Sequence, residues 1–462
     1  MMSIEKIKYF ETKYEVETIR ANGHQVWSLI RYSLWAFYSS EVSPISVGSF
    51  GFTRIIELGK QFFYGFTTYF GRYDYLGFSD SSERKLIDGK WVDKSVDFIL
   101  DGLPRSLLFE IPLPRHYPTT KIPTLHIASK LPLYALERMY TIFNLKNTKI
   151  ENEHIIKQLL DEMGVDFDYL KVIKKNIAQY KVGKLIWRLY KPKGVIIQCA
   201  YTNTGFVKAF KDNGVKVIEV QHGLISFGHV AYNVFKKLDN SYFPDYFLSY
   251  GDREIEIFKN ENFYVPADRV IPAGHYYLEI IRKSKRTLKE YLPEASGYRY
   301  CVSVTGQLLP HIELRFIKFI IEVAKQISET CFIYIPRNLS SDIYKADRLP
   351  SNLIIARDRD TYEIIRLTSC HTTMYSTCAI EALALGTPNI LVNIDNLAQV
   401  HLGETLGSRK FTIFVDTLEE YIEALNRVKG CRKEEIIKLN SDLISPYYQN
   451  NVREFLKMIF AD

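Results

Sequence analysis

Short apolar runs alternate with longer amphipathic stretches along most of this chain. Runs of strand length occur at 106–111, 194–200, 215–220 and 245–251, and stretches with helical periodicity lie at 152–163, 167–180 and 204–214. Buried parallel strands are short continuous apolar runs, and the helices that connect them are apolar on one face only. The pattern therefore predicts an α/β domain in the first half of the chain.

A second series of the same kind follows the basic stretch 281–297, which contains Pro and Gly and suits an interdomain connection. Its predicted strands are 299–306, 331–336, 352–357, 388–394 and 411–415, and its predicted helices are 313–327, 361–368, 377–386 and 418–428. This order is Rossmann-like. We expect an α/β fold of two Rossmann-like domains, residues 1–275 and 276–462, with a cleft between them and a final helix able to cross back.

Composition supports a globular protein of this size. The 462 residues are 47% hydrophobic and 14% aromatic, which is enough for two packed cores. A net charge of +7 suits anionic ligands or an anionic membrane surface, and no stretch has the composition of a nucleic-acid module. The six cysteines form no CxxC pair and no metal-ligand spacing, which favours a reducing, cytoplasmic compartment.

The N-terminal residues have no signal-peptide pattern, because charges interrupt them throughout. The most apolar early segment, 26–38, contains Arg31 and is shorter than the roughly 20 residues that span a bilayer. A core helix is the simplest interpretation of this segment, and a helix lying on a membrane surface is the alternative.

The segment 370–391 is the strongest candidate for a ligand site in the second domain. Ser376 or Thr377 can cap a helix whose N–H groups suit phosphate oxygens. Glu381 follows Thr377 by four residues, so both lie on one helix face, where a carboxylate can accept hydrogen bonds from a ribose. An ordinary capped helix followed by a glycine stop explains the same residues.

Two further strand ends contribute candidates. Gly306 and Gln307 follow the first strand of the second domain, where a glycine allows close approach to a phosphate. Arg337 follows the next strand and can pair with a phosphate or a carboxylate. Plain turns remain the alternative. Asp358 and Asp360 have DxD spacing but precede a helix, so capping is the simpler role and no metal site is predicted.

A histidine-containing turn follows the predicted strand 215–220. It holds Gln221, His222, Gly223, His229 and Tyr232, in the sequence "VQHGLISFGHVAYN". Imidazole titrates near neutral pH, so His222 can act as a general base or can hold an anionic or hydroxyl group. A structural turn is the alternative. The grouping of several polar residues at a strand end favours a sugar- or acceptor-binding site.

The loop "SDSSERK" offers a rival base, Asp80, and a cation for an acceptor's anionic groups, Arg84. A solvated surface loop explains this composition equally well. The choice between His222 and Asp80 as the base stays open, and a transferase that retains configuration needs neither.

The helix that carries Ser376, Thr377 and Glu381, followed by "ALGTPNILVNI", resembles the nucleotide-sugar site of GT-B glycosyltransferases and nucleotide-sugar 2-epimerases. The resemblance implies that the two hydroxyls bind phosphate and that the glutamate binds ribose. The histidine turn, with "YFPDYFLSYG" (242–251) and "RVIPAGHYYLE" (269–279), resembles bacterial glycosyltransferases of capsule and lipopolysaccharide synthesis.

This second resemblance implies metal-independent transfer of a sugar from a nucleotide-sugar, which is a substrate and not a cofactor, to a glycan or lipid-linked acceptor. No cofactor is expected. It implies a cytoplasmic protein, compatible with peripheral contact at the inner face of the membrane. A nucleotide-sugar 2-epimerase, a polyol-phosphate transferase and a non-catalytic nucleotide-sugar binding protein are the alternatives.

Overall fold

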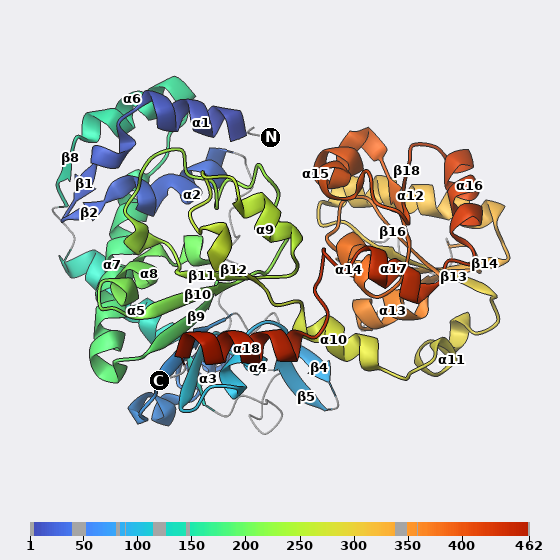
Figure 1. Ribbon diagram of the computed structural model, residues 1–462, viewed down its shortest axis with the longest axis horizontal. Coiled ribbons are helices and arrows are strands. Elements are labelled where there is room, and N and C mark those ends of the chain that lie inside the picture. The colour runs from blue at the N-terminus through green and yellow to red at the C-terminus, as the bar shows by residue number, and fades with distance from the viewer. Residues whose placement is uncertain are drawn as a thin grey trace. The chain divides into compact units, whose positions relative to one another are not determined.

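The computed structural model describes residues 4–38, 52–79, 84–87, 89–113, 126–144, 148–337, 349–357 and 359–460 (Figure 1). The chain forms two compact units. Unit 1 consists of Met1–Ser249, Glu254–Ala273 and Gln449–Asp462, and unit 2 of Tyr250–Arg253 and Gly274–Tyr448. The main division falls at residues 273 and 274, and the last helix, α18 (Tyr448–Phe460), lies almost entirely in unit 1.

Unit 1 is built on a parallel sheet of seven strands in the order β12-β11-β10-β9-β3-β6-β7. The strands are β3 (Tyr75–Phe78), β6 (Ser106–Glu110), β7 (Ile127–Ser129), β9 (Gly194–Gln198), β10 (Lys216–Val220), β11 (Tyr246–Ser249) and β12 (Val270–Pro272). In chain order, the first six strands follow the Rossmann order 3-2-1-4-5-6. The strand order reverses between β3 and β9, which makes this the switch point of unit 1.

Helices cover both faces of this sheet. On one face α7 (Tyr169–Tyr190) and α8 (Thr204–Lys211) pack against β3, β6, β9 and β10, and α5 (Leu131–Asn144) packs on α7. On the other face lie α4 (Asp97–Asp101) and α18, of which α18 is the red helix in Figure 1. The ring of Phe460 occupies the space left by Gly194, so this glycine admits the last helix.

A second core in unit 1 joins α1 (Ile4–Lys13), α2 (Val26–Tyr38), α6 (Glu153–Met163) and the start of α7. The apolar segment 26–38 is α2, and it is a core helix as the simplest interpretation predicts. Its Arg31 is buried and pairs with Glu11, with a distance of 3.0 Å between Nε and Oε1. No helix among the described residues is both long and apolar enough to cross a membrane.

The remaining elements of unit 1 are short or lie at its edges. They are β1 (Arg20–Ala21), β2 (His24–Gln25), α3 (Phe52–Phe62), β4 (Arg84–Ile87), β5 (Lys90–Asp93), β8 (Ile150–Glu151) and α9 (Arg253–Phe258), whose first residue belongs to unit 2.

Unit 2 is built on a parallel sheet of six strands in the order β15-β14-β13-β16-β17-β18. They are β13 (Tyr300–Thr305), β14 (Thr330–Ile335), β15 (Leu353–Ile355), β16 (Cys370–Thr373), β17 (Asn389–Val392) and β18 (Thr412–Val415). This is again the Rossmann order 3-2-1-4-5-6, and its switch point lies between β13 and β16.

The helices of unit 2 also divide between the two faces of the sheet. α12 (Pro310–Gln326) and α16 (Leu418–Val428) share one core with Val302 and Val304 of β13, whereas α13 (Thr361–Leu367) shares the opposite core with Cys301. The other helices are α10 (Tyr276–Lys283), α11 (Leu288–Tyr291), α14 (Cys378–Ala384), α15 (Leu397–Leu406) and α17 (Lys433–Leu439).

The central strand β16 is polar, and its sequence Cys-His-Thr-Thr contains no aliphatic residue. All four residues are buried, and the side chains of His371, Thr372 and Thr373 all have hydrogen-bond partners, which for Thr372 is Tyr421 of α16. His371 contacts the Thr305 hydroxyl at 2.9 Å through Nε2 and Asn389 Oδ1 at 2.8 Å through Nδ1. These contacts join β16 to both neighbouring strands.

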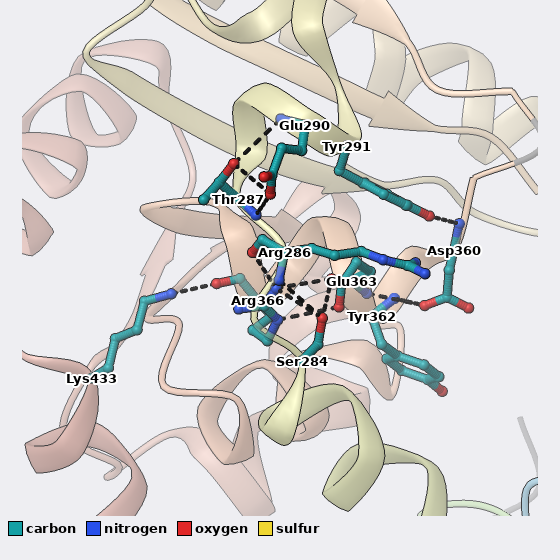
Figure 2. A network of polar contacts seen from close by, with 10 residues as sticks. All are labelled: Ser284, Arg286, Thr287, Glu290, Tyr291, Asp360, Tyr362, Glu363, Arg366 and Lys433. Atoms are coloured by element: carbon teal, nitrogen blue, oxygen red, sulfur yellow. Dashed lines mark hydrogen bonds and ion pairs between the residues drawn. The ribbon is translucent and has the colours of Figure 1, made fainter. Parts of the chain in front are cut away.

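The basic stretch after α10 is part of unit 2 and does not serve as an interdomain connection. Figure 2 shows that Ser284 donates to Glu363 at 2.8 Å, while Arg366 donates to the carbonyl oxygen of Arg286 at 2.8 Å. Thr287 forms a capping box with Glu290 at the start of α11. The charged side chains of Glu363 and Arg366 on α13 therefore hold this stretch through its Ser284 hydroxyl and its Arg286 carbonyl oxygen.

Candidate functional sites at the two switch points

Six predicted donor-site residues lie along the carboxyl edge of the unit 2 sheet. Gly306 and Gln307 follow β13, Arg337 follows β14, and Ser376, Thr377 and Glu381 follow β16. The loops after β13 and β16 meet at the switch point, where Gln307 Nε2 donates to the Thr373 hydroxyl at 3.0 Å. Open α/β sheets bind ligands at this position because the adjacent loops diverge there.

Gly306 lacks a side chain because a carboxylate occupies that space. A Cβ at this position would overlap Glu313, which lies in the first turn of α12 and also accepts a hydrogen bond from the backbone N–H of Gln307. The predicted reason for this glycine was close approach to a phosphate. The structure adds that the glycine leaves room for an internal carboxylate, which holds the loop, and the approach to a phosphate stays a prediction.

The hydroxyl pair and the glutamate after β16 differ in exposure. Thr377 is half-buried and makes no side-chain cap, whereas the Ser376 hydroxyl is buried and accepts from the Cys378 N–H at 3.3 Å. Glu381 is also buried, and its Oε1 accepts from the Tyr362 hydroxyl at 2.8 Å. Thr377 is therefore the more accessible of the two hydroxyls.

Arg337 is exposed, and its positive charge lowers the pKa of Tyr375 and Cys378, although burial raises both pKa values more strongly. Its charge therefore acts on the loop that begins α14. Asp360 caps α13 as predicted, because its Oδ1 accepts from the N–H groups of Tyr362 at 2.9 Å and Glu363 at 3.0 Å. Asp358 lies outside the described residues.

The histidine turn follows β10 in unit 1, as predicted. His222 Nε2 lies 3.0 Å from the Tyr201 hydroxyl and 3.2 Å from Cys199 Sγ, and Cys199 directly follows the neighbouring strand β9. Burial lowers the pKa of His222 to about 4, and it also lowers the pKa of His229 to about 4. Both imidazoles are therefore neutral at pH 7.

A buried carboxylate lies behind this turn. Glu219 accepts hydrogen bonds from the Ala200 N–H at 3.0 Å, the Tyr232 hydroxyl at 3.2 Å and the Tyr264 hydroxyl at 2.8 Å. Burial raises the pKa of Glu219 to about 7, and these hydrogen bonds oppose that rise. Sequence inspection missed Glu219, because a glutamate within an apolar strand carries no local signal of its partners.

The other predicted residues of the turn differ in role. Gln221 is buried and donates to the Gly223 carbonyl oxygen at 2.9 Å, so it shapes the turn. Tyr232 is fully buried in an apolar cluster. Gly223 faces open space, and His229 packs its ring on Tyr232. His222, Gly223 and His229 are therefore the members of the turn with exposed surface.

Arg84 does not lie on a solvated loop. Its side chain is 0% exposed and lies 2.7 Å from Asp97 and 2.9 Å from Glu110, measured from guanidinium nitrogen to carboxylate oxygen. The prediction that it binds an acceptor is corrected, because both faces of the guanidinium are taken by internal acceptors. Asp80 lies outside the described residues.

A pocket of about 660 Å³ lies at the switch point of unit 1. Its base includes Ser79, which follows β3, together with Gln198 and Cys199, where β9 ends. Its walls come from α5, α7 and the residues before them. This volume suits a small-molecule ligand. Cys199 connects the pocket to the histidine turn, because it lines the pocket and its Sγ contacts His222.

Comparison with known proteins gives likeness in structure only. No family model matches the chain, and no curated protein sequence matches it. Solved structures do match. The S. aureus MnaA–UDP complex has a TM-score of 0.51 at 10% identity, covering 84% of this chain and 98% of that chain.

Two further structures match at a TM-score of 0.50. One is UDP-GlcNAc 2-epimerase from Neisseria meningitidis bound to UDP-GlcNAc, which is 13% identical over 84% of this chain and 99% of that chain. The other is the glycosyltransferase SnogD from Streptomyces nogalater, which is 8% identical over 84% of this chain and 100% of that chain. These likenesses confirm the predicted fold of two Rossmann-like α/β units, as in GT-B proteins.

Proposed function

We propose that the protein is a glycosyltransferase that moves a sugar from a nucleotide-sugar to a glycan or lipid-linked acceptor of a surface polysaccharide. The nucleotide-sugar would bind at the carboxyl edge of unit 2, with Thr377 and Ser376 at its phosphates and Arg337 balancing the charge of the leaving group. The proposed reaction uses no cofactor and no metal.

The pocket of unit 1 is the observation that favours transfer to an acceptor over epimerisation. A transferase needs a second substrate site, whereas a 2-epimerase acts on one substrate. The pocket has its own switch point and its own lining, and it adjoins the turn that carries His222. His222 is neutral at pH 7, so its role at the acceptor is to hold or deprotonate a hydroxyl.

Contact with a membrane surface is a further part of this proposal. The rings of Phe63, Phe66 and Phe70 form a continuous series of contacts after α3, and Phe70 is 75% exposed. Exposed aromatic side chains beside basic ones, here Lys60 and Arg72, suit the interface of an anionic bilayer. Flotation with vesicles containing phosphatidylglycerol should recover the protein, and replacing Phe63 and Phe70 by Ser should abolish recovery.

The test of the reaction begins with binding. UDP-, GDP-, CMP- and CDP-linked sugars are screened by thermal shift, and the donor that stabilises the protein is incubated with lipid-linked glycans for product analysis. His222→Ala should abolish transfer and leave donor binding nearly unchanged. Inversion at C-2 of the donor sugar without an acceptor, detected by NMR, would identify an epimerase. Nucleotide release with no product on any acceptor would refute the proposal.

A further inference from the structure

The pocket of unit 1 contains two buried polar groups whose hydrogen-bonding capacity is unused. Glu137 is 6% exposed, and its Oε1 is shielded from solvent and has no hydrogen-bond partner among the described residues. Gln198 is 8% exposed, and its Oε1 accepts from the Ser79 hydroxyl at 3.2 Å, while its Nε2 has no partner in the described part of the chain.

Both residues line the pocket, and together they carry one acceptor and one donor that no described residue satisfies. Leaving such groups unpaired costs stability, because each has lost its hydrogen bonds to water. A hydroxyl group both donates and accepts, and neighbouring hydroxyls of a sugar satisfy a carboxylate and an amide together. The pair therefore indicates a hydroxylated ligand.

The rim of the pocket is cationic. Lys171 and Lys175 lie one turn apart on α7, Arg138 follows Glu137 on α5, and Lys130 precedes α5. Arg138, Lys171 and Lys175 have no ion pair with any carboxylate among the described residues. The lining contains four cationic side chains against the single carboxylate of Glu137. Unpaired cations around a concave site favour an anionic ligand.

We propose that this pocket binds a sugar that carries a phosphate or carboxylate group, with Glu137 and Gln198 on its hydroxyls and Arg138, Lys171 and Lys175 on its anion. Its assignment as the acceptor rests on the proposed function, whereas the binding itself does not. Glu137, Gln198 and the three cations are then the residues that select the acceptor.

The position of α5 extends the inference to a lipid-linked ligand. One face of α5 carries Glu137, Arg138 and Thr141 into the pocket lining, and an adjacent face exposes Met139 and Phe143. An apolar chain attached to the bound phosphate has an exposed apolar surface beside the pocket. The same chemistry is also available from a soluble sugar phosphate, and the experiment separates these sources.

The experiment uses isothermal titration of the full chain with glucose 1-phosphate, glucose and inorganic phosphate, and with farnesyl glucosyl phosphate in phosphatidylcholine vesicles. We expect glucose 1-phosphate to bind more tightly than either of its parts. Arg138→Ala with Lys175→Ala should weaken its binding by roughly tenfold or more, because charged hydrogen bonds are lost. Glu137→Gln should weaken the binding of glucose 1-phosphate more than the binding of inorganic phosphate.

Lys174→Ala is the matched control, because Lys174 lies on α7 beside Lys175 but does not line the pocket. It should bind glucose 1-phosphate as the wild type does. Tighter binding of the farnesyl ester supports a lipid-linked acceptor, and equal binding supports a soluble one. The proposal is overturned if no anionic sugar binds, or if the pocket variants and Lys174→Ala behave alike. Binding that is retained without any transfer activity would refute the glycosyltransferase assignment alone.

Discussion

Replacing Arg84 by Met should strongly destabilise unit 1. The change removes the cation from a fully buried cluster and leaves the carboxylates of Asp97 and Glu110, which are 1% and 0% exposed, without their partner. Asp93 lies in the same cluster and is also fully buried. Removal of one partner from a buried ion pair costs about 3–5 kcal/mol, because the remaining charge stays desolvated.

Tryptophan fluorescence isolates this unit. The four tryptophans of the chain, Trp27, Trp35, Trp91 and Trp187, all belong to unit 1, so urea unfolding followed by their emission reports unit 1 alone. With a urea m-value of about 3 kcal/mol/M, the expected loss moves the midpoint down by about 1–1.7 M. Lys157→Met is the control variant, because it breaks only an exposed ion pair with Glu153 on α6. It should lower the free energy of unfolding by less than about 1 kcal/mol.

The stability that Arg84→Met loses relative to the wild type should also depend on pH. Burial raises the pKa of Glu110 to about 7, although Arg84 opposes this rise. A carboxyl whose folded pKa exceeds its unfolded value contributes most stability at low pH, and this contribution is lost as pH rises through the folded pKa. Removing Arg84 raises that pKa further, so the deficit of the variant should be larger at pH 8 than at pH 5.5. A midpoint like that of Lys157→Met, or a deficit independent of pH, would refute the reasoning.

Three further predictions concern the two switch points. The pKa of His222 and of His229 is about 4 in the folded protein, against an ordinary value of 6.5. Their contribution to stability is therefore full above pH 6.5 and is lost as pH falls toward 4. When both histidines are replaced by Gln, the urea midpoint should fall less between pH 7.5 and pH 5 than it does in the wild type. Gly306→Ala should lower the free energy of unfolding by about 1–3 kcal/mol, because the new methyl group overlaps Glu313. Adding Glu313→Ala should recover part of this stability, as measured by calorimetry. His371→Leu should lower the Tm of unit 2 by calorimetry, at a cost of about 1–3 kcal/mol for each polar group left unpaired, and an unchanged Tm would contradict the bridging role of His371.

Most of the long helices and strands could be predicted, because the positions that they bury carry apolar residues. The strand predicted at 331–336 is β14, and the helix predicted at 418–428 is α16, with matching bounds. The strand β16 was missed because its buried face consists of histidine and threonine, whose partners Thr305 and Asn389 come from other strands. Polar strands of this kind give no apolar run to detect.

The candidate sites were predictable as strand ends but not as sets of contacts. The histidine turn follows from the predicted strand at 215–220, whereas the residues after β16 follow from the predicted helix at 377–386 and from the resemblance, because β16 itself was not predicted. Arg84 was misplaced, because local sequence does not distinguish a solvated arginine from one buried between two carboxylates distant in the chain. The pocket of unit 1 was missed for the same reason, since Glu137 and Gln198 approach each other only through the crossing of α5 over the sheet.

The return of the last helix to unit 1 determines the order in which the units can be completed during synthesis. Residues 274–448 form unit 2 as one continuous segment after the four residues 250–253 have been made. Unit 1 still lacks α18 at that stage, and the ring of Phe460 fills the space beside Gly194 only after residue 460 has been made. The usual sequence, in which the N-terminal domain folds first, is therefore reversed here. A nascent chain stopped before residue 448 would hold a finished unit 2 and an open apolar face on the unit that was synthesised first.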